Sequence, residues 1–329
     1  MQLDHPGAID TSPLTLRDVP EPAPSPHQIR VRVRACAVCH TDLHITEGDL
    51  PLPRLPVIPG HQSVGIVDAM GSDAKRFQLG DRVGIPWLYW TDGTCAHCLR
   101  GDENLCDHGR FTGYHADGGY AELCVVDEDF AHPIPPAFSD EHAAPLLCAG
   151  IIGYRSYRMT NLIAGRKLGL YGFGASAHLV LQLARHQGHD VYVFTRGEGH
   201  RALAKQLGAA WTGSADDKPP HELDGSIIFA PAGSLVPLAL KTLRKAGTLA
   251  LAGITMSPIP EIDYGLLYQE RILRSVANST RQDCREFLQL AAEIPLETRV
   301  RSYELDQANQ ALSDLKHSRF DGAAVLRVS

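Results

Sequence analysis

The stretch Lys167-Leu168-Gly169-Leu170-Tyr171-Gly172-Phe173-Gly174-Ala175-Ser176-Ala177 carries the clearest structural signal in the second half of this chain. Its first five residues predict a buried strand, and the glycines after them predict a tight turn into a helix. Gly172 and Gly174 would let backbone N–H groups approach a pyrophosphate at the helix N-terminus, with Ala177 in the third glycine's place. Alone, the motif is not decisive, because any tight strand-to-helix turn favours glycine.

The residues around this turn supply the context that the motif needs. Helices are predicted at residues 175–187 and 200–207, and strands at residues 190–194, 226–230 and 248–251. Alternating strands and helices of this kind form a parallel sheet with helices on its faces. In that setting the turn is a dinucleotide-binding fingerprint.

The end of the second strand indicates which dinucleotide is bound. An NAD site usually has Asp or Glu there for the ribose hydroxyls, whereas this chain has Thr195 and Arg196, with Arg201 one turn later. A guanidinium without a carboxylate favours NADP(H), with NAD(H) as the alternative if Arg196 only stacks on the adenine. The expected cofactor contacts of this half are Gly172, Gly174, Ala175, Ser176, Ala177, Thr195, Arg196 and Arg201.

The first part of the chain has a different pattern. Short apolar runs punctuated by Gly and Pro, such as residues 29–34, 64–67, 82–85 and 121–126, predict a β-rich domain, a closed or partly closed barrel. Ser139 with the acids after it predicts a helix start. A C-terminal helical segment is expected to begin with residues 283–292.

Length and composition restrict the function classes. A chain of 329 residues is long enough for two domains, and 44% hydrophobic with 21% charged residues is typical of a globular protein. The net charge of −7 argues against a nucleic-acid partner. We find no membrane-spanning run and no signal-peptide pattern, so we expect a cytoplasmic protein without a membrane partner. Its eight cysteines are then expected to be mostly reduced, and clustered ones to bind metal and not to form disulfides.

One candidate metal site combines residues far apart in the sequence. Residues 35–44 follow a predicted strand and are rich in metal-binding and proton-transferring groups. Cys39 lies in this stretch, His61 in a Gly/Pro turn before a strand, and Cys148 at the end of a predicted helix. A Cys₂His set with one open position is a known catalytic zinc arrangement, but such a set has no local spacing signature.

A second candidate metal site is local. The spacing C-x₂-C-x₇-C joins Cys95, Cys98 and Cys106 in a glycine-containing loop, which is typical of a structural zinc site. Asp92 precedes Cys95 by three residues and repeats the x₂ spacing, so it is the first candidate for a fourth ligand. The rival fourth ligands are His97 and His108, and a lobe that has lost its metal is the remaining alternative.

Together these residues resemble one family, the zinc-dependent alcohol dehydrogenases of the medium-chain dehydrogenase/reductase superfamily. The resemblance covers essentially the whole chain. Its motifs are Cys39-His40-Thr41-Asp42-Leu43-His44, Gly60-His61, Pro86-Trp87-Leu88, the 92–106 lobe, Gly118-Gly119-Tyr120-Ala121-Glu122, Cys148-Ala149-Gly150 and the turn at Gly172.

The resemblance implies an α/β architecture of two domains. We expect a GroES-like β-rich catalytic domain at residues 1–149 and 281–329, and a Rossmann domain with a doubly wound parallel sheet at residues 150–280. The active site would lie in the cleft between them, and the protein would be a homodimer or homotetramer.

The resemblance also implies roles for the site residues. Cys39, His61 and Cys148 would hold the catalytic zinc, and Cys95, Cys98 and Cys106 a structural zinc, with Asp92 in place of the family's first cysteine. Asp42 would orient the imidazole of His61. Thr41 would hydrogen-bond the substrate oxygen, His44 would pass its proton towards solvent, and His40 would lie against the cofactor phosphates.

Gln62 departs from the family, which usually has glutamate directly after the histidine ligand. The family's glutamate can approach the zinc during water exchange, so a neutral amide predicts slower turnover without an inactive site. Trp87, Leu88 and Trp90 are expected walls of an apolar substrate pocket, and their alternative role is ordinary core.

The function implied is hydride transfer between NADP(H) and a small alcohol/aldehyde pair, most simply a primary alcohol. A cinnamyl- or sugar-alcohol-type dehydrogenase of the same superfamily is the alternative within enzymes. A non-catalytic zinc-binding relic or redox sensor is the alternative of another class, and the retained Thr41 and His44 argue against it.

Overall fold

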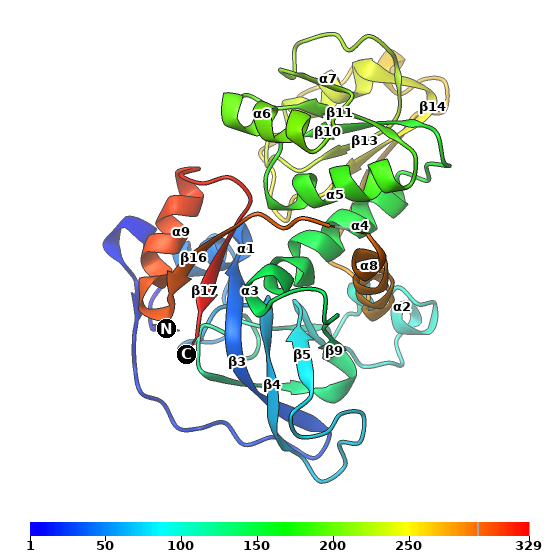
Figure 1. The fold of residues 1–329 in the computed structure, drawn as a ribbon. Coiled ribbons are helices and arrows are strands. Elements are labelled where there is room, and N and C mark those ends of the chain that lie inside the picture. Colours follow the sequence, from blue (N-terminus) through cyan, green and yellow to red (C-terminus); the bar gives the residue numbers. More distant parts are fainter. Residues whose placement is uncertain (295, 329) are drawn as a thin grey trace. The chain divides into compact units, whose positions relative to one another are not determined.

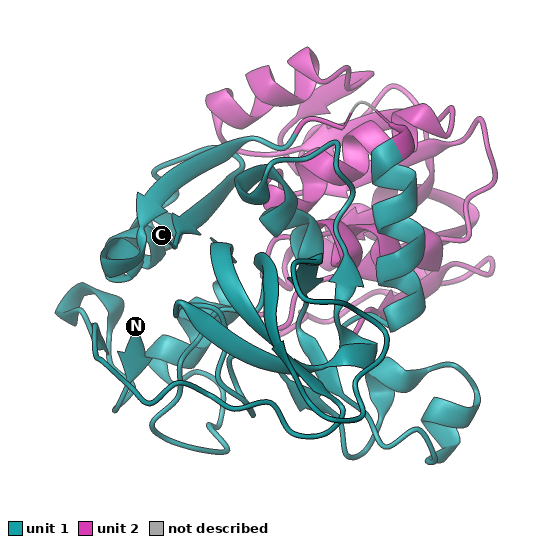
Figure 2. Ribbon diagram, turned by 60° about the horizontal axis from the view of Figure 1, so that its bottom comes forward, with its two compact units in different colours: residues 1–149, 278–292, 298–329 teal, residues 150–277, 293–297 magenta. Residues whose placement is uncertain are grey.

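The computed structural model describes residues 1–294 and 296–328. Its chain contacts divide it into two compact units (Figure 2). Unit 1 contains residues 1–149, 278–292 and 298–329, and unit 2 contains residues 150–277 and 293–297. Each unit has its own hydrophobic core.

Unit 1 is built around a seven-stranded sheet. Its strand order is β16-β17-β3-β4-β5-β9, with β8 also paired to β3, and only β16 and β17 run parallel. These strands are β3 (Gln28–Val38), β4 (Ser63–Met70), β5 (Arg82–Ile85), β8 (Leu123–Asp127), β9 (His132–Pro133), β16 (Val300–Glu304) and β17 (Ala323–Arg327). Two small antiparallel pairs accompany it, β1 (Gln2–Leu3) with β2 (Leu14–Thr15) and β6 (Leu88–Trp90) with β7 (Arg110–Phe111).

The alternating sequence of β3 explains its place in the centre of this sheet. Val31 and Val33 are fully buried, whereas Arg30 and Arg32 point to the other face and both pair with Asp68 of β4. In Figure 1, β3, β4 and β5 run side by side, coloured from blue to cyan. The β-rich prediction is therefore confirmed, and the C-terminal residues add β16 and β17 to a sheet that begins almost 300 residues earlier.

Short helices connect these strands. The α-helices of unit 1 are α1 (His40–Glu47), α2 (Ala96–Leu99), α3 (Asp140–Ala143), α8 (Arg281–Glu293), whose last residue belongs to unit 2, and α9 (Ala308–Lys316). The 3-10 helices are η1 (Ile9–Thr11), η2 (Glu103–Leu105), η3 (Glu128–Phe130), η4 (Ala144–Leu147) and η6 (Leu305–Gln307). The Ser139 hydroxyl accepts a hydrogen bond from the His142 N–H, which confirms the predicted helix start.

Unit 2 contains a six-stranded parallel sheet of order β12-β11-β10-β13-β14-β15. Its strands are β10 (Lys167–Tyr171), β11 (Asp190–Phe194), β12 (Trp211–Gly213), β13 (Leu223–Ile228), β14 (Leu243–Leu251) and β15 (Ile272–Ser275). Its helices are α4 (Ala149–Met159), which starts on the last residue of unit 1, α5 (Ala175–His186), α6 (Glu198–Gln206), α7 (Leu235–Thr242) and the 3-10 helix η5 (Tyr264–Leu266).

Apolar side chains cover both faces of this sheet. Leu168 and Val191 belong to one buried cluster, and their strand neighbours Tyr171 and Tyr192 belong to another. Successive residues of a strand point to opposite faces, so the two clusters are the two helix-covered sides of a Rossmann sheet. The doubly wound prediction is confirmed. Among the described residues, no helix has both the length and the apolar character that crossing a membrane requires.

Candidate active site

Cys39, His61 and Cys148 converge in unit 1, with their potential ligand atoms within 4.8 Å of one another. Cys39 Sγ lies 4.0 Å from Cys148 Sγ, and His61 Nε2 lies 3.4 Å from Cys148 Sγ. At a tetrahedral zinc, bonds of about 2.3 Å to sulfur and 2.1 Å to nitrogen separate two sulfurs by about 3.8 Å and a sulfur from a nitrogen by about 3.6 Å. The three donors therefore fit a zinc ion in chemistry and in spacing.

Three local structures position these donors. Cys39 is the N-cap of α1, directly after β3 ends. His61 follows Gly60, whose φ of 100° is accessible to glycine, and a Cβ there would meet Tyr120 at 2.4 Å. Cys148 lies between η4 and α4, which agrees with its predicted place at a helix end. A rigid strand, a tight turn and a helix junction thus hold the set.

Asp42 links two of the ligands and is fully buried. Its Oδ1 accepts the His61 Nδ1–H at 2.8 Å and the Gly60 N–H at 3.1 Å, and its Oδ2 accepts the Cys39 N–H at 3.0 Å. With Nδ1 engaged, the imidazole presents Nε2 to the two sulfurs.

The electrostatics of the set favour a cation. The hydrogen bond between the two thiols lowers the pKa of Cys39 well below its ordinary value and raises that of Cys148. Burial alone would lower the pKa of His61, but the Asp42 carboxylate raises it to about 10. A buried carboxylate and a thiolate in contact with one imidazole give the pocket negative charge, which a bound metal would neutralise.

The remaining residues of α1 surround this set. Thr41 is buried, and its hydroxyl lies 3.8 Å from Cys39 Sγ. His44 Nδ1 lies 2.7 Å from Asp49 Oδ2, so the Asp49 carboxylate orients the imidazole, a contact that sequence reasoning missed. His40 is exposed at the first position of the helix.

The second group also assembles. Asp92, Cys95, Cys98 and Cys106 bring one carboxylate oxygen and three sulfurs within 4.8 Å of one another. Hydrogen bonds from the backbone N–H groups of Cys95 and Thr94 lower the pKa of Asp92 well below its usual range, so it offers an ionised oxygen. The chemistry of the four donors fits zinc.

The two rival fourth ligands lie outside this group of donors. His97 Nδ1 accepts a hydrogen bond from Arg100 Nη2 at 3.1 Å, and His108 is exposed. All eight cysteines lie within the described residues and are free thiols.

The cofactor turn has the geometry that its glycines suggest. Gly172 has a φ of 87°, and its N–H donates to the Phe194 carbonyl at 2.9 Å, so the end of β10 is tied to the end of β11. Gly174 is the N-cap of α5, and a Cβ added there would meet no atom within 4 Å. Open space in front of a helix N-terminus is where a pyrophosphate binds.

The end of β11 presents two arginines. Arg201 Nε donates to the Thr195 carbonyl at 2.9 Å, which fixes that side chain beside the strand end. Thr195 is buried. Arg196 is exposed, and the described part of the chain gives it no hydrogen-bond or ion-pair partner.

Similarity to known proteins shows which family this chain belongs to. The family model of the alcohol dehydrogenase GroES-like domain matches residues 25–136, and that of the zinc-binding dehydrogenases matches residues 177–293. The chain is 51% identical over 333 residues to "Probable alcohol dehydrogenase AdhA" of Mycobacterium tuberculosis (strain CDC 1551 / Oshkosh), covering 99% of this chain and 96% of that protein. The chain belongs to the zinc-binding alcohol dehydrogenases of the medium-chain dehydrogenase/reductase superfamily.

Solved structures agree with this alcohol dehydrogenase fold. Acetophenone reductase from Geotrichum candidum NBRC 4597, in complex with NAD, is 25% identical with a TM-score of 0.87, covering 96% of this chain and 94% of that one. CAD from Helicobacter pylori, complexed with NADP(H), is 24% identical with a TM-score of 0.85, covering 92% and 91%. The family resemblance is confirmed, and the substrates of this alcohol dehydrogenase are small alcohols or aldehydes.

The three residues expected to line the substrate pocket have different surroundings. The indole of Trp87 lies against the His61 ring, with a centroid distance of 5.0 Å and an interplanar angle of 74°. Leu88 is buried in the core of unit 1. Trp90 lies under the Arg110 guanidinium and lines another pocket, of about 460 Å³, with Tyr89.

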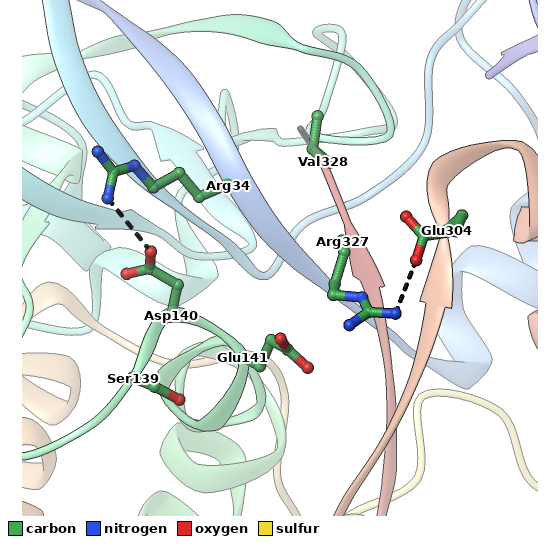
Figure 3. Close-up of a pocket in the computed structure, with 7 residues that line it drawn as sticks. All are labelled: Arg34, Ser139, Asp140, Glu141, Glu304, Arg327 and Val328. Atoms are coloured by element: carbon green, nitrogen blue, oxygen red, sulfur yellow. Dashed lines mark hydrogen bonds and ion pairs between the residues drawn. The ribbon is translucent and has the colours of Figure 1, made fainter.

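A second pocket of unit 1, of about 540 Å³, shares no residue with either donor group (Figure 3). Its lining residues are Arg34, Ser139, Asp140, Glu141, Glu304, Arg327 and Val328. Two of its ion pairs join side chains of the pocket itself, Arg327 with Glu304 at 2.7 Å and Arg34 with Asp140 at 3.8 Å. Because these charges already neutralise one another, we assign no substrate to this pocket.

Gln62 is buried beside His61, and its side-chain Oε1 has no hydrogen-bond partner among the described residues. Its backbone carbonyl accepts the Ala37 N–H at 3.0 Å, so the backbone of this residue is fixed by β3. A glutamate here would reduce the positive charge of the metal-loaded site and offer a further oxygen ligand.

We therefore expect Gln62→Glu to raise kcat about threefold at equal zinc content, since ligand exchange becomes easier. Steady-state kinetics with zinc analysis of both proteins measures this. Gln62→Met, which has a similar length but no charge, is the control and should not be faster. An unchanged or lower kcat in the zinc-loaded glutamate variant would show that Gln62 does not slow turnover.

Proposed function

We propose that this alcohol dehydrogenase transfers hydride between NADP(H) and primary alcohols or aldehydes, at a zinc held by Cys39, His61 and Cys148. The observation that carries the proposal is the convergence of these three donors around the buried Asp42, at distances that suit tetrahedral zinc. Zinc bound there would act as a Lewis acid, lowering the pKa of an alcohol or polarising an aldehyde carbonyl, and the nicotinamide would supply or accept the hydride.

The side chains of α1 would handle the proton. Thr41, buried beside Cys39, would hydrogen-bond the substrate oxygen and relay its proton, the hydroxyl accepting one proton and releasing its own. His44 would pass the proton towards solvent, and the Asp49 carboxylate would steady its ring in that position. His40, exposed at the helix start, would contact the cofactor phosphates.

The remaining alternatives are less well supported. The 51% identity to a protein named as an alcohol dehydrogenase favours that activity over a cinnamyl- or sugar-alcohol specialist. A non-catalytic relic or redox sensor would not need the buried Thr41 or the oriented His44. Zinc analysis together with reduction of a panel of aliphatic and aromatic aldehydes by NADPH tests the proposal. A zinc-loaded protein that turns over none of them would contradict it.

We favour NADP(H) because of the charges at the end of β11. The exposed Arg196 has no ionic partner among the described residues, and Arg201 is held at the same strand end. A guanidinium can bind a 2′-phosphate with two parallel hydrogen bonds, which the ribose hydroxyls of NAD do not require.

Arg196→Ala should weaken the apparent affinity for NADPH about 10- to 100-fold and change that for NADH by less than about threefold. Cofactor titrations at a fixed aldehyde concentration measure both constants. Arg196→Lys should lose less, because it keeps the charge. Unchanged constants for NADPH and NADP⁺ would show that the preference for NADP(H) is wrong.

We also propose a homodimer or homotetramer. β15 is one of the two edge strands of the unit 2 sheet, and its Ile272 is exposed, as are Tyr264 and Tyr268 shortly before it. A strand edge with apolar side chains around it is a template for pairing with another chain. Light scattering that gives the mass of one chain, 35.8 kDa, would contradict the proposal.

A further inference from the structure

A row of four aromatic rings ends on the imidazole of the candidate zinc ligand His61. Trp87 lies against His61, Phe111 stacks on Trp87 with a centroid distance of 4.9 Å and an interplanar angle of 8°, and His115 lies 5.5 Å beyond Phe111. Tyr114 also contacts Trp87, at 5.9 Å. The row therefore runs from the metal ligand to a turn that follows β7.

This turn is fixed to two backbone segments, one at Trp87 and one directly before His61. The buried Thr112 donates its N–H to the Trp87 carbonyl at 2.9 Å and its hydroxyl to the Pro86 carbonyl at 2.8 Å. Gly113 packs so closely on the Pro59–Gly60 backbone that a Cβ would meet Gly60 N at 2.8 Å. The turn thus has little freedom to move relative to either Trp87 or the loop that carries His61.

The backbone of Phe111 is also held in place, and its ring contacts the His115 ring. The Phe111 N–H donates to His115 Nδ1 at 3.2 Å, and the His115 N–H returns to the Phe111 carbonyl at 2.9 Å. The Tyr114 hydroxyl donates to the Pro51 carbonyl, which ties the turn to a third segment. The phenyl ring on this backbone stacks on one face of the Trp87 indole.

From this arrangement, and resting on the proposed function, we infer that Phe111 is a positioning residue that sets the width of the substrate pocket by holding Trp87 against His61. An indole covered on one face by a fixed ring cannot rotate away from a bulky substrate, because the space behind it is filled. The pocket should therefore accept linear and flat primary alcohols and exclude branched ones.

The substitution Phe111→Leu tests this inference. It removes the flat ring behind Trp87, so the indole gains freedom to tilt into the vacated space. The ratio of kcat/KM for cyclohexylmethanol to kcat/KM for 1-propanol should rise about tenfold, mainly through a lower KM for the bulky alcohol. Phe111→Tyr keeps the stacked ring and should keep the wild-type ratio. Phe111→Met replaces the leucine variant if that protein does not fold.

A double-mutant cycle separates positioning from a general structural effect. In a Trp87→Phe background, Phe111→Leu should no longer change the ratio by more than about twofold, since the side chain that it positions is gone. The change in tryptophan emission that Phe111→Leu causes in the wild-type background should also vanish there, and this readout does not depend on turnover.

The outcomes are distinguishable. A wild-type chain that oxidises 1-propanol while Phe111→Leu leaves the ratio and the emission unchanged would overturn the inference alone. If Phe111→Leu raises the ratio equally in both backgrounds, the effect comes from the space that the smaller side chain leaves and not from Trp87. That result would also overturn the inference. A zinc-loaded wild-type chain without turnover of any alcohol or aldehyde would overturn the proposed function, and the inference with it.

Discussion

Asp42→Asn should lower both the zinc affinity of the site and kcat/KM by about 10- to 100-fold. The Asp42 carboxylate accepts three hydrogen bonds, from His61 Nδ1, the Gly60 N–H and the Cys39 N–H, and it is fully buried. An asparagine has one acceptor oxygen and one amide nitrogen, so at least one of these donors loses its partner. In either orientation of the amide the imidazole loses its negatively charged neighbour, and where the amide nitrogen faces Nδ1 it also loses its hydrogen-bond acceptor.

Competition with a chelator of known affinity, followed by kinetics at saturating zinc, separates the two losses. Asp68→Asn is the matched control, because Asp68 is a carboxylate of the same unit that pairs with two arginines, on β4, and is not among the three ligands or their hydrogen-bond partners. That variant should keep wild-type zinc affinity and kcat/KM. An Asp42→Asn protein with wild-type values in both measurements would show that His61 does not depend on Asp42.

Asp92→Ala should reduce the zinc content from about two ions per chain to about one and lower Tm by about 5 °C, with kcat changed little. The alanine removes one of four donors, and the remaining three sulfurs hold zinc less tightly. Elemental analysis after dialysis and a thermal melt of the same sample measure both effects. Retained zinc and an unchanged Tm would point to another ligand.

Two further variants separate the ligand role of Asp92 from its role in the turn. Asp92 Oδ1 accepts the N–H groups of Thr94 and Cys95, so alanine also removes two hydrogen bonds. Asp92→Asn keeps an acceptor for them but loses the anionic ligand, and should still release zinc. Asp107→Ala changes an exposed carboxylate of the same lobe and should retain it.

Elements of unit 2 could be predicted because their signals are local. The strands at residues 167–171 and 190–194 were expected with the bounds that the structure shows, since each is an apolar run that Gly or a polar residue ends. The helix after Gly174 was predicted one residue too long. The turn after β10 could be identified from the conformational preferences of its own glycines.

Long-range pairing explains what the sequence could not provide. β3 continues past Arg34 to Val38, because Ala35 and Cys36 pair with β17, about 290 residues away. Leu88 of β6 is buried, whereas Trp87, directly before this strand, contacts His61. The sequence of these neighbouring residues did not reveal which side chain points in which direction. Phe111 stacks on Trp87 only because β6 and β7 pair, and neither strand exceeds three residues.

Anomalous diffraction at the zinc absorption edge, from crystals of the protein purified without added metal, would locate the zinc ions that the protein binds. We predict one peak among Cys39 Sγ, His61 Nε2 and Cys148 Sγ, and a second among Asp92 and its three cysteines. Absence of the first peak in a protein that is active as an alcohol dehydrogenase would show that Cys39, His61 and Cys148 do not hold a catalytic zinc.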